Sequence, residues 1–146
     1  MHLEGSFTVR ALRERVWLFF IDPYALASCI DDPHDIEVIN DDYFKGWVRS
    51  GVAFMKGTFT GWARITEKNP PERGHVKAHG GGMGSGFDAD STIELTETDG
   101  HTTVRWVADI VLSGTIASVG ARLVQGVVDK KTNEFFENVR KRLESE

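Results

Sequence analysis

The sequence predicts an α+β protein in which a curved antiparallel sheet of six to seven strands packs around one long C-terminal helix. Between residues 36 and 112, strand-like segments follow one another with only short turns between them, which leaves no room for crossover helices. Apolar residues then recur at helical spacing over residues 114–143. Because the sheet and the amphipathic helix must bury each other's apolar faces, the two patterns together predict the fold class.

The elements before the meander are one strand and two short helices. Residues 3–9 alternate between apolar and polar side chains, as a half-buried strand does. Residues 12–20 carry a helical apolar pattern, and Pro23 suits the first turn of a second short helix over residues 24–29. The later strands are expected at residues 36–39, 43–50, 54–67, 74–80, 87–97 and 102–112.

Size and charge exclude several classes of protein. The 146 residues suffice for one core, and we expect a single domain over residues 1–146. A net charge of −5 without a dense basic run argues against nucleic-acid binding. Cys29 is the only cysteine, so an internal disulfide and a cysteine-based zinc site are excluded. No apolar stretch has the length of a membrane span, and we expect a cytoplasmic protein with at most peripheral membrane contact.

Small residues at inward positions of the sheet predict a cavity. The simplest pairing of the second and third meander strands places Trp47 opposite Trp62 on the polar face. Val48 then lies opposite Gly61 on the inward face. Glycine in the middle of a concave face leaves volume, because sheet and helix cannot collapse onto it everywhere.

The C-terminal helix shows the same use of glycine. Gly120 and Gly126 interrupt its buried side, although each glycine in a helix costs about 1 kcal/mol relative to alanine. Such a cost suggests close approach, either by the sheet backbone or by a ligand. Glycines from three elements favour a cavity, and tight glycine packing is the alternative.

The expected lining of this cavity is mostly apolar, with Ser50, Ser91 and the Cys29 thiol as its polar groups. Such a lining suits a flat or greasy organic molecule. The residues expected to bind the ligand are Val48, Ser50, Phe59, Gly61, Ala63, Phe87, Ser91, Ile93, Trp106, Ile110, Val119, Leu123, Gly126 and Val127.

Motifs that could indicate other chemistry have simpler interpretations. The glycine run over residues 80–86 lies between two strands, so it has no helix N-terminus to hold a phosphate, and it is either a mobile lid or a plain hairpin. His75 and His79 would be about 13 Å apart on one strand, too far to share a metal. Asp88 and Asp90 alternate outward on a solvated face. We therefore expect no catalytic residue, no metal site and no cofactor.

Trp47 and Trp62 are expected as neighbours on the outer face of the sheet. One interpretation is a cross-strand aromatic pair, which stabilises a sheet by up to about 1 kcal/mol. The other is a docking surface for a partner or for a second copy of the chain, since exposed aromatic residues mark interfaces.

Several blocks of sequence, in order along essentially the whole chain, resemble the CoxG family of carbon monoxide dehydrogenase subunits. The glycine run of residues 80–86 is one of them. The others are LEGSFTV (3–9), RERVW (13–17), DPYALASCI (22–30), KGTFTG (56–61), NPPE (69–72), GARLVQG (120–126) and FFEN (135–138).

The resemblance implies both a fold and a role. That family belongs to the START-like, polyketide-cyclase-like (SRPBCC) superfamily, so a helix-grip fold with a hydrophobic-ligand cavity is implied. It also implies an association with a molybdenum carbon monoxide dehydrogenase, in membrane attachment or in handling a quinone-like electron carrier. The family often has Pro-Gly after its Cys-Ile, whereas this chain has Asp31-Asp32, so we expect a different loop shape there.

Three hypotheses about function remain open at this point. The first is a non-catalytic protein that binds a lipid- or quinone-like molecule and acts as an accessory or adaptor of the dehydrogenase. The second is an enzyme of the polyketide cyclase or hydratase type, which needs two or more acid/base groups inside the cavity. The third is an interaction module with a filled core, acting through Trp47 and Trp62.

Overall fold

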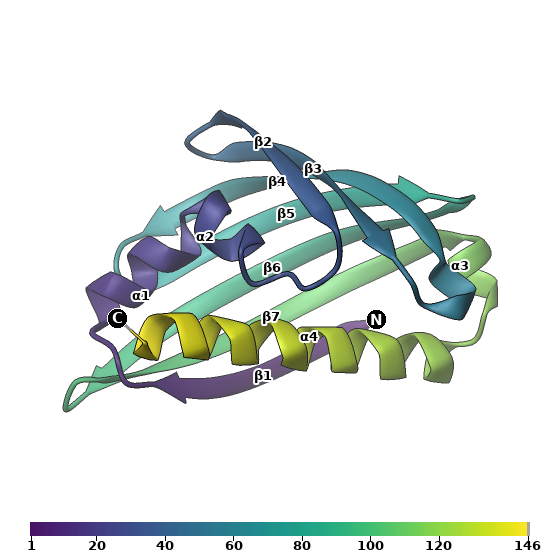
Figure 1. Cartoon of the computed structure of the whole chain (residues 1–146). Coiled ribbons are helices and arrows are strands. Elements are labelled where there is room, and N and C mark those ends of the chain that lie inside the picture. Colours follow the sequence, from purple (N-terminus) through teal and green to yellow (C-terminus); the bar gives the residue numbers. More distant parts are fainter. Residues whose placement is uncertain (146) are drawn as a thin grey trace.

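The computed structural model describes residues 1–145 and shows a strongly curved sheet wrapped around a long helix (Figure 1). The seven antiparallel strands are ordered β1-β7-β6-β5-β4-β3-β2, so the first strand pairs with the last and the others form consecutive hairpins. The predicted helix-grip fold is thereby confirmed. The strands are β1 (His2–Val9), β2 (His34–Asn40), β3 (Tyr43–Ser50), β4 (Gly57–Asn69), β5 (Arg73–Gly82), β6 (Ser85–Thr98) and β7 (His101–Gly114).

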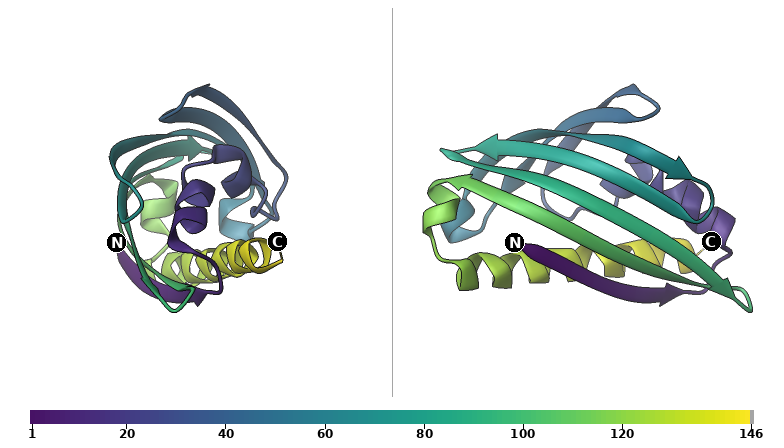
Figure 2. Two further views of the ribbon diagram at one scale, coloured as in Figure 1. Left: turned by 90° about the vertical axis from the view of Figure 1, so that its left-hand side faces the viewer. Right: turned by 180° about the vertical axis from the view of Figure 1, so that it is seen from behind.

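The helices lie on the concave side of the sheet (Figure 2, left). Two short ones follow β1, and the Asp22 side chain caps the second by accepting hydrogen bonds from the backbone nitrogens of Tyr24 and Ala25. Pro23 occupies the first turn of that helix, as predicted. The helices are α1 (Arg13–Phe20), α2 (Pro23–Ala27), α3 (Thr115–Ser118) and α4 (Ala121–Glu144), with a 3₁₀ turn η1 at Ala53–Met55.

The hydrophobic core lies at one end of the molecule. There the C-terminal half of α4 and the helix α1 pack against β1, β6 and β7. Thr102 is fully buried and donates a hydrogen bond to the backbone oxygen of Ala11 (2.7 Å), so its hydroxyl is satisfied. The buried cluster consists of Val9, Ala11, Val16, Trp17, Cys29, Leu95, Val104, Val139 and Leu143.

The prediction of one continuous helix over residues 114–143 is wrong. Gly120 has φ +115°, a conformation that side-chain-bearing residues rarely adopt, and it separates α3 from α4. Within α4 itself, apolar residues spaced four apart drift around the helix, because one turn has 3.6 residues. Val124 is buried, whereas Leu123, which was expected to face the sheet, is 60% exposed.

The predicted pairing of β3 with β4 is wrong by two residues. Trp47 lies opposite Thr60, and Trp62 lies opposite Lys45. Since side chains alternate with period two, the shift leaves the same residues on the inward face. A strand was also expected from residue 54, where the structure has η1 and β4 begins only at Gly57.

The glycine run of residues 80–86 forms a tight hairpin. Gly80–Gly82 end β5, and Met83 and Gly84 make the turn with φ values of +53° and +75°. Two residues with positive φ are what the common two-residue hairpin turn requires. The run is therefore the connection of an ordinary hairpin between β5 and β6.

Gly120 adopts a backbone conformation that needs glycine, whereas Gly126 lies in a regular helix. Exchanging each for alanine tests this difference. Gly120→Ala should lower the free energy of unfolding by about 1–3 kcal/mol, because alanine is strained at its φ. Gly126→Ala should raise it by about 1 kcal/mol, because the added methyl group meets open space inside a helix. Urea denaturation measures both values. Equal effects would mean that the backbone at Gly120 does not determine where α4 begins.

Candidate ligand cavity

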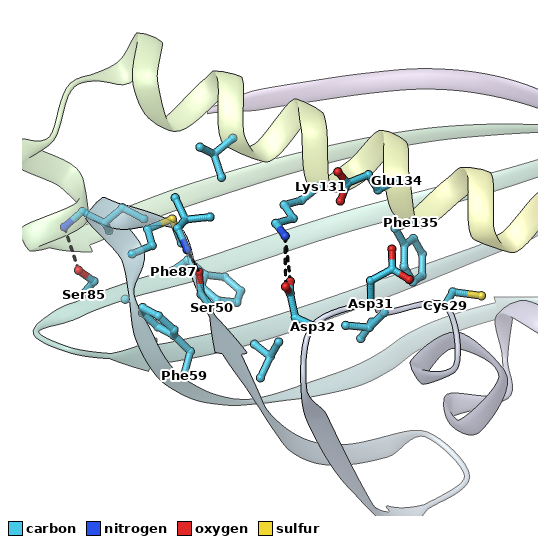
Figure 3. Close-up of a pocket in the computed structure, with 17 residues that line it drawn as sticks. Cys29, Asp31, Asp32, Ser50, Phe59, Ser85, Phe87, Lys131, Glu134 and Phe135 are labelled. Atoms are coloured by element: carbon cyan, nitrogen blue, oxygen red, sulfur yellow. Dashed lines mark hydrogen bonds and ion pairs between the residues drawn. The ribbon is translucent and has the colours of Figure 1, made fainter.

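A cavity of about 300 Å³ lies between the sheet and α4. Its walls come from the loop after α2, from β3, β4 and β6, and from α3 and α4, so distant parts of the chain build it (Figure 3). The lining residues are Cys29, Ile30, Asp31, Asp32, Val48, Ser50, Val52, Met55, Phe59, Ser85, Gly86, Phe87, Ile116, Val127, Lys131, Glu134 and Phe135.

One half of the cavity is apolar and contains two aromatic rings. Figure 3 shows Phe59 and Phe87 between Ser85 at one end and the Asp32–Lys131 pair. Phe87 is an inward-facing residue, yet 36% of it is exposed, so water reaches its ring inside the cavity. Gly80 permits this placement, because a Cβ there would lie 2.4 Å from a carbon of the Phe87 ring. The ring therefore lies on the bare backbone of β5.

Two hydroxyl groups add limited polarity to this half. Ser85 Oγ accepts a hydrogen bond from the backbone nitrogen of Ile116 (2.9 Å), and Ser50 Oγ accepts one from that of Val52 (3.2 Å). Each hydroxyl keeps its own proton as a donor. The apolar half can therefore offer two hydrogen-bond donors to a ligand that carries acceptor oxygens.

The other half of the cavity carries charge. Lys131 of α4 forms an ion pair with Asp32, with its Nζ 3.0 and 3.3 Å from the two carboxylate oxygens. Asp31 and Glu134 line the same half, which Figure 3 shows toward Cys29. Three carboxylates face one ammonium group, so this half has a surplus of negative charge. These charged lining residues were not predicted from the sequence. The one indication was the different loop shape expected at Asp31-Asp32.

Side chains on one face of α4 hold the loop over residues 28–32 in place. Besides the Lys131 ion pair, Asn138 donates through Nδ2 to the backbone oxygen of Cys29 (2.9 Å) and to the Asp31 carboxylate (3.1 Å). One turn further, the Arg142 guanidinium donates to the Ser28 hydroxyl. These α4 residues are spaced seven and four positions apart, which places them on one helix face. The wall that closes the charged half is thus fixed to the helix.

Cys29 belongs to the core and not to the chemistry of the cavity. It is 1% exposed, and its thiol donates weakly to the backbone oxygen of Ala25 (3.6 Å). Burial raises the pKa of the Cys29 thiol, so little thiolate is present near neutral pH.

The structure brings some of the expected lining residues together at this cavity, namely Val48, Ser50, Phe59, Phe87 and Val127. The cavity adjoins a hollow of about 200 Å³ under β3, β4 and β5, which Gly61 and Ala63 line. At Gly61 a Cβ would lie 2.4 Å from the backbone oxygen of His79. Gly61 therefore permits β4 and β5 to approach closely, which is the tight glycine packing that was the alternative to a cavity at this position.

The remaining expected residues lie elsewhere. Trp106 lines a separate cavity of about 500 Å³ between β1 and α4, and Ile110 lines another of about 450 Å³ near α3. Leu123 is mostly exposed, and a Cβ at Gly126 would meet open space. None of the described cavities is lined by Ser91, Ile93, Val119, Leu123 or Gly126.

The histidines of β5 face outward and pair with carboxylates of β6. His79 Nδ1 lies 2.7 Å from Asp88, and His75 Nε2 lies 3.5 Å from Asp90. Within residues 1–145, no three His, Cys, Asp or Glu side chains are grouped so that they could hold a metal ion. The same residues include no helix long and apolar enough to cross a bilayer.

Solved structures place the fold among the START-like helix-grip proteins. A START superfamily protein from Mycobacterium smegmatis superposes with a TM-score of 0.78 at 10% identity, covering 99% of this chain and 97% of that one. A protein from Chromobacterium violaceum gives a TM-score of 0.73 at 16% identity, over 98% and 97% of the two chains. At these identities the likeness concerns the fold.

A family model then identifies the group within that class. Residues 5–144 match the model of CoxG, a carbon monoxide dehydrogenase subunit, and the chain belongs to that family. A conserved protein from Geobacillus kaustophilus is similar in structure, with a TM-score of 0.91 and 26% identity over 98% of this chain and 95% of that one. No curated protein matches the sequence.

The lone cysteine can report how firmly α4 holds the loop over residues 28–32. Ellman's reagent should react slowly with native Cys29, because the thiol is buried and its pKa is raised. Asn138→Ala should accelerate the reaction about tenfold, since losing its part-buried hydrogen bond to the Cys29 backbone costs about 1–2 kcal/mol of local stability.

Gln125→Ala is the matched control, because the side chain of Gln125 donates to Asp129 on the same helix and to no other residue within 1–145. Its reaction rate should equal that of the native protein. If both variants reacted at the native rate, Asn138 would not hold the loop closed over Cys29.

Proposed function

We propose that the protein is a non-catalytic carrier of a hydrophobic small molecule, of the lipid or quinone kind, in the cavity between the sheet and α4. The observation that carries this proposal is the water-accessible apolar space around Phe59 and Phe87. A volume of about 300 Å³ corresponds to roughly ten waters at about 30 Å³ each. Exchanging such waters for an apolar ligand is favourable, because apolar surface then leaves contact with water.

The charged half of the cavity limits which ligands fit. Asp31, Asp32 and Glu134 face a single cation, Lys131, which is already paired with Asp32. An anionic head group would therefore be repelled there and would lose its hydration as well. The cavity favours an uncharged molecule over a fatty-acid-like anion.

The partner we propose is a molybdenum carbon monoxide dehydrogenase-type oxidoreductase. Membership of a family described as a subunit of carbon monoxide dehydrogenase supports this accessory role. In that role the carrier would hold its ligand near the oxidoreductase without performing chemistry on it.

An enzyme of the polyketide cyclase or hydratase type is the second candidate, and the carboxylates in the cavity favour it. An acid/base mechanism needs two free groups facing the substrate. Asp32 is held by Lys131 and Asp31 by Asn138. Among the residues of the described chain, Glu134 is the one cavity carboxylate without such a partner, which supports the carrier over the enzyme.

Filling the cavity tests its location. Val127→Trp places an indole in the cavity and should abolish binding of the uncharged fluorescent probe N-phenyl-1-naphthylamine. Leu123→Trp, one turn earlier on the exposed side of α4, should leave binding unchanged. Fluorescence titration measures both, and circular dichroism checks the fold. The reverse pattern would place the ligand on the side of α4 that carries Leu123.

Matched ligands test the charge preference. A long-chain alcohol should displace the probe at a concentration at least about tenfold lower than the carboxylic acid of equal chain length, a difference of about 1.4 kcal/mol. Asp31→Asn combined with Glu134→Gln should reduce this difference, because two of the repelling charges are removed. Preference for the acid in the native protein would contradict the proposed ligand class.

A further inference from the structure

Over β1 and β3–β7, the convex outer face of the sheet, opposite the cavity, divides into a basic and an acidic half, and the edge strand β2 adds the exposed carboxylates Asp35 and Glu37 beside the basic half. Figure 2 (right) shows this face from behind, with α4 on its far side. Outward positions of β3, β4 and β5 carry the exposed cations Lys45, Arg49, Arg64 and Lys77. Outward positions of β6, β7 and β1 carry Asp88, Asp90, Glu94, Asp109 and Glu4, with Arg105 among them.

One row of residues across the strands places like charges side by side. Arg64 lies opposite Lys77, Lys77 opposite Asp90, and Asp90 opposite Asp109. The row therefore has the charge order plus, plus, minus, minus. Like charges directly opposite on neighbouring strands destabilise a sheet, and this row contains two such pairs.

The isolated chain only partly compensates these charges. Arg64 stacks on the Tyr43 ring at 4.6 Å, and Asp109 pairs with His2 at 2.7 Å. Asp90 has a longer contact with His75 (3.5 Å). Within residues 1–145, Lys77 has no hydrogen-bond or ion-pair partner. The charged side chains of this row, Lys77 above all, can therefore pair with charges of another molecule.

The adjacent row adds apolar surface. Trp62 lies opposite His79, His79 opposite Asp88, and Asp88 opposite Val111. Val111 is 67% exposed, and Trp62 lies between the rings of Tyr43 and His79 at centroid distances of 6.2 and 6.1 Å. Trp62 thus presents an aromatic group on the basic half, between Lys45 and His79, and Val111 presents an apolar group on the acidic half.

We propose that the outer face binds a second copy of this chain around a two-fold axis that runs parallel to the strands between β5 and β6. Rotation about such an axis brings each row of one copy against the same row of the second copy, with the order of the strands reversed. Arg64 then faces the second copy's Asp109, and Lys77 faces its Asp90. In the next row, Trp62 faces Val111 of the second copy. A two-fold interface needs such self-complementarity, and aligned packing of two sheets is a common arrangement.

The acidic half distinguishes this occupant from others. A partner with a uniformly acidic surface, or an anionic bilayer, would attract Arg64 and Lys77 but repel Asp90 and Asp109. A second copy satisfies both halves at once. The interface is rich in charge, so the dimer is salt-sensitive, and it lies on the face opposite the ligand cavity.

Charge reversal with complementation tests the proposal. Sedimentation equilibrium of the full chain should show a dimer at low ionic strength that dissociates at high ionic strength. Arg64→Glu with Lys77→Glu, and separately Asp90→Lys with Asp109→Lys, should each raise the dissociation constant at least about tenfold. An equimolar mixture of the two double variants should again form dimers, because each reversed half meets its reversed counterpart.

Other results would overturn the proposal. A native chain that is monomeric at low ionic strength contradicts it, and so does a mixture of variants that fails to associate while both keep the native circular dichroism spectrum. Loss of binding to anionic lipid vesicles in the first variant alone, with a monomeric native chain, would assign the basic half to a lipid surface instead. Probe binding in the cavity should stay unchanged in both variants, so failure here is distinguishable from failure of the proposed function.

Discussion

The uneven packing of α4 against the sheet determines where this protein can bind a ligand. Val139 and Leu143, near the C-terminal end of the helix, are almost completely buried against α1 and the sheet. Earlier in the helix, Val127, Lys131 and Phe135 face the cavity instead. The helix is thus packed at Val124 and again toward its C-terminal end, and the part between these two regions lines the cavity. Tight packing along its whole length would leave no room for a ligand.

The same helix also positions the polar end of the cavity. Lys131 and Asn138 reach across to the loop over residues 28–32, where they bind the Asp32 carboxylate and the backbone oxygen of Cys29. Side-chain contacts from α4 therefore hold this loop in place. A carrier must admit and release its ligand, and a wall held by a few polar contacts is suited to that.

Much of the fold was predictable from the sequence, because turn residues and apolar periodicity act locally. The six meander strands and the Pro23 helix start follow directly from such patterns. The prediction of a single long helix was wrong, because periodicity alone does not show that Gly120 adopts a positive φ and separates α3 from α4. Leu123 and Val124 also differ from the expectation: a spacing of four residues drifts around a helix with 3.6 residues per turn, so Leu123 is exposed and Val124 is buried.

The cavity was harder to predict than the fold, because its charged half depends on contacts between distant segments. Lys131 lay off the apolar stripe of the helix, and nothing local connected it with Asp32, 99 positions away. Glycine in the sheet was an ambiguous signal: Gly80 accommodates the Phe87 ring, whereas Gly61 serves only strand packing. Residues of the apolar half, such as Phe59 and Phe87, were found because strand alternation fixes the inward face.

Native mass spectrometry of the protein purified from its own host tests the central claim most directly. The account predicts a non-covalent adduct that organic solvent extracts as an uncharged hydrophobic molecule, and it predicts that Val127→Trp prepared in the same way lacks this adduct. Native protein at the bare chain mass, or an adduct that persists in Val127→Trp, would contradict a ligand-carrying cavity at this position.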